Sequence, residues 1–208
     1  GGQGNVAIGT EALKTNVSGN NNFALGTEAL KVSTASNNVA VGGLSQPATS
    51  TGEKNVSLGY FTLNANTTGF ENVAIGNVAM QLNVDGYRNI AIGSEALLSN
   101  SAGYGNIGFG QGALYSSTGD RNIVIGYQSG ASLTSGSRNI LVGSSITFPS
   151  NTGSNQMTIG NIIYATGVDG TGTTVSSGSV GIKTNSPQRS LHVAGEVRIA
   201  DLSTDTPT

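Results

Sequence analysis

A short motif of alternating large and small apolar residues recurs along most of this chain. It reads Asn, a large apolar residue, a small residue, a second large apolar residue and Gly, as in the stretch 72–76 (Asn-Val-Ala-Ile-Gly). Nine copies keep both the Asn and the Gly, and a tenth, with Gln156 in place of Asn, ends at Gly160. The closing glycines lie 16 or 17 residues apart. A fixed period held over this many copies indicates a repeat protein.

The alternation within each copy predicts a short β-strand. The two large residues are mostly β-branched and two positions apart, so they share one face of the strand. We assign these large side chains to the core of the chain. The central repeats supply the clearest examples: Val73, Ile75, Ile90, Ile92, Ile123 and Ile125.

The small residue between the two large ones points to the opposite face. A solvated strand face would carry Thr, Lys or Glu, whereas a run of Ala, Ser and Gly indicates that something packs very close to it. We predict that other copies of the chain pack there, in a homotrimer with this column near its axis. The column consists of Ala7, Ala24, Ala40, Ser57, Ala74, Ala91 and Gly108.

The remainder of each repeat supplies a second apolar side and a polar turn. A small residue followed by Leu or Met comes soon after the closing Gly, as in Ala79-Met80, and another Gly precedes the next Asn by three residues in most copies. We expect the Asn to hydrogen-bond neighbouring backbone and to stack on the Asn of the next repeat. One rung buries too little to be stable alone, but stacked rungs share a continuous thin core. The sequence therefore predicts an all-β parallel β-roll, or β-solenoid, of about ten 16–17-residue rungs.

The repeats end near residue 160, and the rest of the chain has a different composition. We expect residues 1–160 to form the roll, 161–181 to be a Gly-, Thr- and Ser-rich connection, and 182–208 to form a C-terminal neck. Within the neck, 190–199 alternates on both sides of Ala194-Gly195, which is typical of a hairpin. The chain starts with Gly1 rather than Met, and we expect it to be part of a longer polypeptide.

Composition excludes several classes of function. The chain of 208 residues has 32 glycines, 10% charged residues and a net charge of −2. That charge gives no electrostatic footprint for nucleic acid. The absence of Cys excludes disulfides and thiolate metal sites, and no apolar run approaches the ~18 residues of a membrane span. With one histidine, His192, and no facing pair of acids, we expect no enzyme activity, no cofactor and no metal.

Two ladders of side chains run along the repeats, and the aromatic one is the only cluster that we consider for binding. The residue before the Asn reads Lys54, Glu71 and Arg88 in three successive repeats, with alternating charge. The residue two before the Asn reads Phe70, Tyr87 and Tyr104, which predicts a stacked aromatic column. Aromatic faces beside Arg88 are suited to binding a glycan that serves as a receptor on a cell surface. The simpler alternative is that the rings only stabilise successive rungs or a contact between chains.

Two parts of the sequence resemble known families of trimeric fibres. The Asn-Val-Ala-Ile-Gly-x-x-Ala-Leu repeats resemble the head repeats of trimeric autotransporter adhesins, which have a shorter rung, fold as a left-handed parallel β-roll and assemble as trimers. The stretch 180–199 (Val-Gly-Ile-Lys-Thr-Asn-Ser-Pro-Gln-Arg-Ser-Leu-His-Val-Ala-Gly-Glu-Val-Arg-Ile) is similar to the neck that precedes the endosialidase-type intramolecular chaperone domain. That domain ends many phage tail fibres and related fibres of contractile injection systems, and it is not in this sequence.

These resemblances imply a function. We expect a structural and receptor-binding segment of a trimeric tail fibre, from a phage or a phage-like contractile injection system, acting outside the cell. The partners would be two further copies of the chain and a cell-surface glycan or protein, without nucleic acid and without membrane insertion. The alternative is the head of a trimeric adhesin on a bacterial surface. A polysaccharide-degrading spike would need a carboxylate-lined cleft, which the sequence does not indicate.

Overall fold

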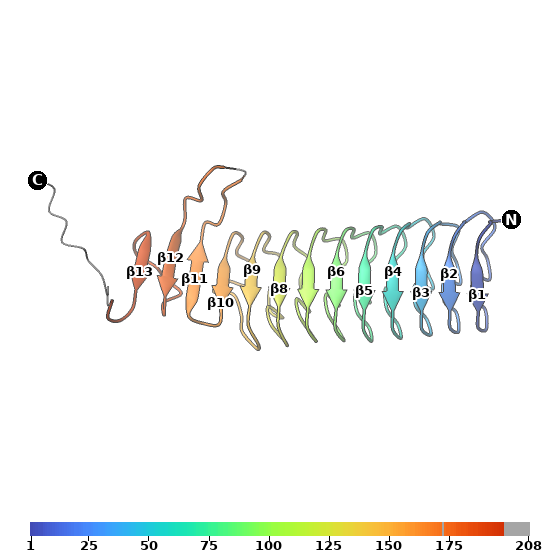
Figure 1. Cartoon of the computed structure of the whole chain (residues 1–208), viewed down its shortest axis with the longest axis horizontal. Helices are drawn as coiled ribbons and strands as arrows, with labels where there is room; N and C mark the ends of the chain where they lie inside the picture. Colours follow the sequence, from blue (N-terminus) through green and yellow to red (C-terminus); the bar gives the residue numbers. More distant parts are fainter. Residues whose placement is uncertain (172, 198–208) are drawn as a thin grey trace, which may run out of the picture.

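The computed structural model describes residues 1–171 and 173–197, and within them the chain consists of strands and turns without a helix. The strands form one sheet in which each lies beside the next in chain order, and the molecule is a long rod (Figure 1). The strands of the ten repeats are β1 (Val6–Ile8), β2 (Phe23–Leu25), β3 (Val39–Val41), β4 (Val56–Leu58), β5 (Val73–Ile75), β6 (Ile90–Ile92), β7 (Ile107–Phe109), β8 (Ile123–Ile125), β9 (Ile140–Val142) and β10 (Met157–Ile159).

Neighbouring strands from β1 to β10 are parallel and paired without any shift. For β5 and β6 the paired residues are Val73 with Ile90, Ala74 with Ala91, and Ile75 with Ile92. Equivalent positions of every repeat therefore form straight columns along the rod. The predicted β-solenoid with a 16–17-residue rung is confirmed.

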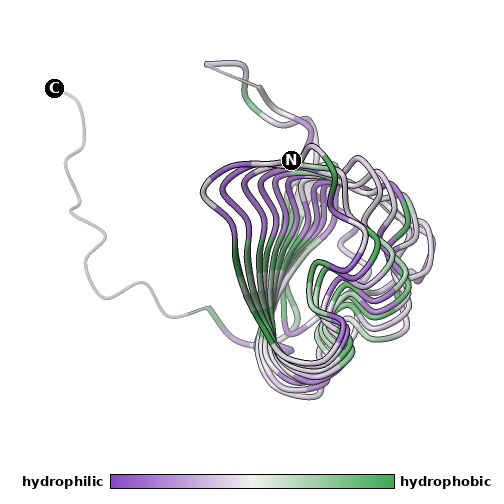
Figure 2. Ribbon diagram, turned by 90° about the vertical axis from the view of Figure 1, so that its right-hand side faces the viewer, coloured by the Kyte–Doolittle hydropathy of each residue, from purple (hydrophilic) through white to green (hydrophobic). Residues whose placement is uncertain are grey.

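The assignment of the two strand faces was wrong, and the structure reverses it. In β2 to β10 the middle residue is buried, whereas its two large neighbours are exposed or half-buried. Ala74, for example, is fully buried between two partly exposed residues, Val73 and Ile75. The large residues assigned to the core thus lie on the outside of the roll, where Figure 2 shows the stacked strands as a green, apolar wall. The residues that we assigned to the core and that lie on the outside are Val73, Ile75, Ile90, Ile92, Ile123 and Ile125.

The interior of the roll is filled from the opposite side, by the Leu or Met that follows the closing Gly. Leu63, Met80 and Leu97 are fully buried and belong to one cluster with the alanines of the strands. Because these long side chains reach across a thin core, they leave room for only a small residue in the strand. This filling is the physical reason why the small residues face inward.

The turns after each strand require unusual backbone conformations. The N–H of Ala79 bonds to the carbonyl of Gly76 (3.3 Å) and the N–H of Gln81 to that of Val78 (3.2 Å), so two tight turns follow each other. Val78 and Met80, third residues of these turns, have φ of 52° and 51°, as in type II turns, where Gly is usual. The closing Gly76 has φ 135°, and a Cβ there would collide with the carbonyl of the next closing glycine. Glycine is therefore required at the end of the strand.

The sheet continues beyond the repeats. After β10 the chain reverses, and β11 (Ile163–Thr166) and β12 (Ser179–Ile182) are antiparallel to their predecessors, whereas β13 (Leu191–Val193) is parallel to β12. The expected connection 161–181 thus contains β11 and the start of β12. The first arm of the predicted neck hairpin is β13, while the second arm extends into 198–199, outside the described residues. No helix long and apolar enough to cross a membrane occurs in the described part of the chain.

Candidate functional site

The outward side of strands β1–β10 carries two continuous columns of large apolar side chains, which we call the apolar strand face. Several are well exposed in the single chain, including Ile8 (55%), Leu58 (47%) and Phe109 (52%). The first column is Val6, Phe23, Val39, Val56, Val73, Ile90, Ile107, Ile123, Ile140 and Met157, and the second is Ile8, Leu25, Val41, Leu58, Ile75, Ile92, Phe109, Ile125, Val142 and Ile159.

The size of this face indicates an interaction surface. At about 4.8 Å per rung and about 7 Å between the two columns, it measures about 48 Å by 10 Å with side chains included. That is about 500 Å², at the upper end of what single-chain proteins expose. No charged residue interrupts either column. A ribbon of this length and uniformity is typical of a surface that another chain covers.

The small residues predicted at the trimer axis do not lie on this surface. Ala24, Ala40, Ala74 and Ala91 are fully buried inside their own chain, and so is Ser57. Gly108 lies against the side chain of Leu97, whose Cγ would be 3.3 Å from an added Cβ. Ala7 is exposed because it lies in the terminal rung. Since their own chain covers all but Ala7, these residues cannot line an axis between chains.

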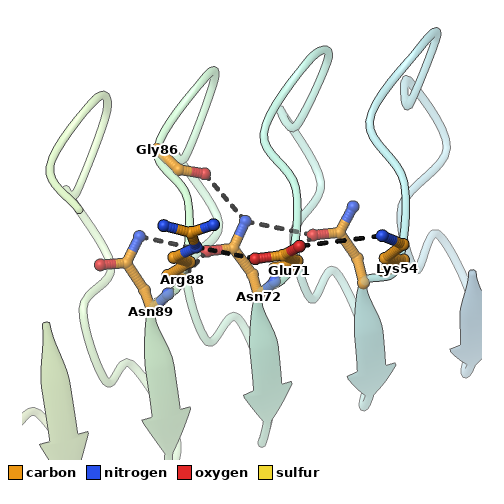
Figure 3. A network of polar contacts seen from close by, with 7 residues as sticks. Lys54, Glu71, Asn72, Gly86, Arg88 and Asn89 are labelled. Atoms are coloured by element: carbon orange, nitrogen blue, oxygen red, sulfur yellow. Dashed lines mark hydrogen bonds and ion pairs between the residues drawn. The ribbon is translucent and has the colours of Figure 1, made fainter. Parts of the chain in front are cut away.

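A ladder of asparagines runs along the top of the strands, as predicted (Figure 3). Asn72 Oδ1 accepts the backbone N–H of Asn89 at 3.0 Å, and Asn72 Nδ2 donates to the carbonyl of Gly86 at 2.8 Å. The same two bonds recur with little change from the first repeat to the ninth. The ladder satisfies buried polar groups of both the strand and the turn, and so fixes the position of the turn above each strand.

The charged ladder beside it forms in the predicted order (Figure 3). Arg88 Nε lies 2.8 Å from Glu71 Oε2, and Lys54 Nζ lies 3.9 Å from Glu71 Oε1. The hydrogen bond from Arg88 is the main cause that lowers the pKa of Glu71. The Lys54 and Arg88 side chains are 60% and 64% exposed, so solvent screens both ion pairs and each contributes little to the stability of the fold.

The predicted aromatic column is confirmed as a stack of parallel rings. The ring centres of Phe70 and Tyr87 are 4.8 Å apart and those of Tyr87 and Tyr104 are 5.0 Å apart, with interplanar angles of 5° in both cases. The Arg121 guanidinium lies 5.1 Å from the centre of Tyr104, and that of Arg88 lies 5.9 Å from Tyr87. The stack therefore ties three rungs together, and the binding of a glycan by these rings stays a prediction.

A pocket that the sequence did not predict lies at one end of the stack. It has a volume of about 250 Å³ and is lined by Thr51, Glu53, Lys54, Thr68, Phe70 and Glu71. The only signal for it in the sequence is that the aromatic column begins at Phe70, with Glu53 instead of a ring in the preceding rung. A second hollow, lined by Glu95, Gly112, Tyr115, Gln128 and Ala131, lies over the turns.

The residues weighed for chemistry lie apart from these surfaces. His192 lies in β13 beside Gly181, and its Nδ1 accepts the backbone N–H of Gln188 at 3.3 Å. Within the described ranges, 1–171 and 173–197, no three His, Cys, Asp or Glu side chains are grouped so that they could hold a metal ion. Comparison of the chain with models of known protein families, with curated proteins and with solved structures found no significant match.

Proposed function

We propose that this chain is a structural and receptor-binding segment of a trimeric fibre, of the kind found on the tail of a phage or of a phage-like contractile injection system. The observation that carries the proposal is the apolar strand face, which is continuous over ten rungs. In the proposed trimer three copies pack through this face around a common axis. The buried alanine column then forms the thin core of each chain, and the large residues form the core of the assembly.

The partner at this face is a second and third copy of the same chain. A parallel copy in register has the same rung spacing over the full length of about 48 Å. Each apolar residue of one chain therefore lies at the same level as the equivalent rung of the other chain. Three copies are proposed in place of two because both resemblances are to trimeric fibres. In a threefold arrangement each chain contacts two neighbours, and the first column of one chain packs against the second column of the next. Such an interface closes into a ring.

The fibre class is supported by the shape of the molecule and by the two resemblances. A straight rod of in-phase rungs holds its ends apart, as a fibre segment must. The similarity of 180–199 to the neck of tail fibres favours a phage or injection system over the alternative, the head of a trimeric bacterial adhesin. Genome neighbourhood separates these two, since tail genes would accompany the first and a membrane-anchor domain the second. We propose no catalytic role.

The assembly is tested by sedimentation equilibrium of the purified chain. We expect a mass of about 62 kDa, three times the 20.8 kDa of one chain. Ile75→Lys combined with Ile92→Lys places charges in the apolar strand face, and unpaired charges are costly to bury. We expect this variant to sediment as a single chain. A wild-type chain that sediments at 20.8 kDa at all concentrations would overturn the trimer.

The adhesive role needs a separate measurement. Fluorescently labelled wild-type chain is incubated with a panel of bacterial cells, and bound label is counted by flow cytometry. We expect binding to a subset of strains. The Ile75→Lys, Ile92→Lys variant should bind more weakly, because a single chain presents one site whereas a trimer presents three. Wild-type trimer that binds no strain would leave a structural segment without the receptor-binding role.

A further inference from the structure

The aromatic column has one covered end and one open end. At the covered end, the Arg121 guanidinium lies 5.1 Å from the centre of the Tyr104 ring. At the other end, the next rung has Glu53 where the column would need a ring, so one face of Phe70 has no aromatic neighbour. Phe70 is 37% exposed, and the pocket of about 250 Å³ lies against it. The stack is therefore shaped to accept one more flat group.

The pocket is built from the same three turn positions of two successive rungs. Thr51, Glu53 and Lys54 stand four, two and one residues before Asn55, and Thr68, Phe70 and Glu71 hold the same places before Asn72. A group stacked on Phe70 would thus lie about 4.8 Å further along the rod, at the level of the first three residues. Polar side chains surround this level, while an apolar ring forms its floor.

Several polar groups that line the pocket are free to bind a ligand. Within the described residues, 1–171 and 173–197, the hydroxyls of Thr51 and Thr68 and the carboxylate of Glu53 make no hydrogen bond or ion pair. All three residues are exposed. The Glu71 carboxylate, in contrast, is held by Arg88 and Lys54. The site therefore combines an aromatic floor with two hydroxyls and one unpaired carboxylate.

This combination matches a pyranose ring. The C–H face of a sugar packs on an aromatic ring, and its hydroxyls donate to carboxylate and threonine oxygens. The unpaired carboxylate of Glu53 disfavours an acidic sugar such as a uronate, because like charges repel. A simple cation is less suitable, because Lys54 lines the pocket and only one aromatic face is present rather than a cage.

We propose that the pocket between the two rungs binds a neutral pyranose, stacked on the open face of Phe70 with its hydroxyls on Glu53, Thr51 and Thr68. The inference rests on the proposed receptor-binding function and names its ligand class. It moves the binding site from the side of the aromatic column, where the sequence placed it, to the end of the column. Tyr87 and Tyr104 then support Phe70 and do not contact the sugar.

The test uses saturation-transfer NMR on the full chain with neutral methyl glucoside, methyl galactoside and methyl mannoside as probes, and with methyl glucuronoside as the acidic counterpart. We expect at least one neutral probe to bind and the glucuronoside to bind more weakly. Phe70→Ala should weaken binding about tenfold, the effect of losing one aromatic contact. The matched control Tyr127→Ala, which removes an aromatic residue that is 49% exposed and distant in sequence from the pocket, should leave binding unchanged.

Two further variants keep the test independent of folding. Glu53→Gln keeps the shape of the site and should raise the affinity for the glucuronoside relative to the neutral probes. Tyr87→Ala should reduce thermal stability more than sugar affinity. No binding of any neutral probe, equal losses in Phe70→Ala and Tyr127→Ala, or choline binding in place of sugar would overturn the proposal.

The outcome is separable from that of the proposed function. Absence of sugar binding by a chain that sediments at about 62 kDa, three times 20.8 kDa, would reject this site and leave the fibre intact. Sugar binding by a chain that sediments at 20.8 kDa would reject the trimer and keep the site.

Discussion

Asn72 Oδ1 accepts a hydrogen bond from the backbone N–H of Asn89, one rung away, at 3.0 Å. The other end of the same amide donates to the carbonyl of Gly86 at 2.8 Å. One side chain thus connects its own strand, the following strand and the turn between them. Because the bond geometry depends only on the rung spacing, the ladder continues unchanged while the apolar residues vary.

The first prediction is that Asn72→Ala destabilises the roll. The substitution leaves the buried Asn89 N–H without its acceptor, and an unsatisfied buried group costs about 1–3 kcal/mol. It also removes the shorter of the two hydrogen bonds to the Gly86 carbonyl, which keeps the one from Asn83 at 3.2 Å. We expect the free energy of unfolding to fall by about 2–4 kcal/mol per chain, measured by urea denaturation. The control is Asn77→Ala, an exposed Asn one residue after the closing Gly. Equal effects of the two substitutions would show that the ladder does not stabilise the fold.

The second prediction concerns the volume shared across the core. Most rungs combine a small strand residue with a large turn residue, such as Ala74 with Met80, but the rung of β8 combines Val124 with Gly130. A Cβ added at Gly130 would lie 3.1 Å from Val124 Cγ2. The larger strand residue therefore fills the space that the missing turn side chain leaves.

Opposite substitutions at the two strand positions should both destabilise the chain. Val124→Ala opens a cavity and should cost about 2 kcal/mol, whereas Ala74→Val overpacks the space below Met80 and should cost about 1–3 kcal/mol. Chemical denaturation of both variants measures the two changes. A stabilising effect of Ala74→Val would show that the core has spare room and that volume does not set the small residues.

Much of the architecture could be predicted from the sequence. The regular period of 16–17 residues predicted the rungs, and the recurring Asn and Gly indicated where side-chain ladders and positive φ are needed. In-phase stacking also followed from the period, so that Phe70, Tyr87 and Tyr104 were correctly placed in one column. These features depend on local chemistry that repeats, and a repeat reports them many times.

The direction of the strand faces could not be predicted in the same way. Alternation shows that Val73 and Ile75 share a face opposite Ala74, but it does not show which face is inside. The usual rule places large residues inward, and it fails here because Met80 already fills the interior from the opposite wall. The inverse sizes at Val124 and Gly130 were the signal in the sequence that links the small residue to the core. The pocket beside Phe70 was missed because it depends on where the aromatic column ends.

The third prediction is a pH dependence that arises from Glu11. Its pKa is lowered from 4.5 to about 2, first by a hydrogen bond from Lys14 and then by one from Lys31. A carboxylate whose pKa is lower in the folded state stabilises the fold above its unfolded pKa. That contribution is lost as the pH falls from about 4.5 towards 2.

The measurement compares melting temperatures of wild type and Glu11→Gln across this range. We expect the wild type to melt higher at pH 7 in low salt, and the difference to disappear as the pH approaches 2. Glu95→Gln is a matched control, because Glu95 has the same φ of 61° and makes no ion pair in the described part of the chain. A pH-independent difference for Glu11→Gln would contradict the ion-pair origin.

The apolar strand face as the contact between chains is tested most directly by thiol labelling, since the chain contains no cysteine. Leu58 on this face and Leu82 in the turn between β5 and β6 are both 47% exposed in a single chain. Leu58→Cys and Leu82→Cys should therefore react with a maleimide at similar rates if the chain is alone. We predict that Leu58→Cys reacts at least about tenfold more slowly in the native protein, because burial in an interface excludes the reagent, and as fast as Leu82→Cys after denaturation. Equal rates in the native protein would contradict the account.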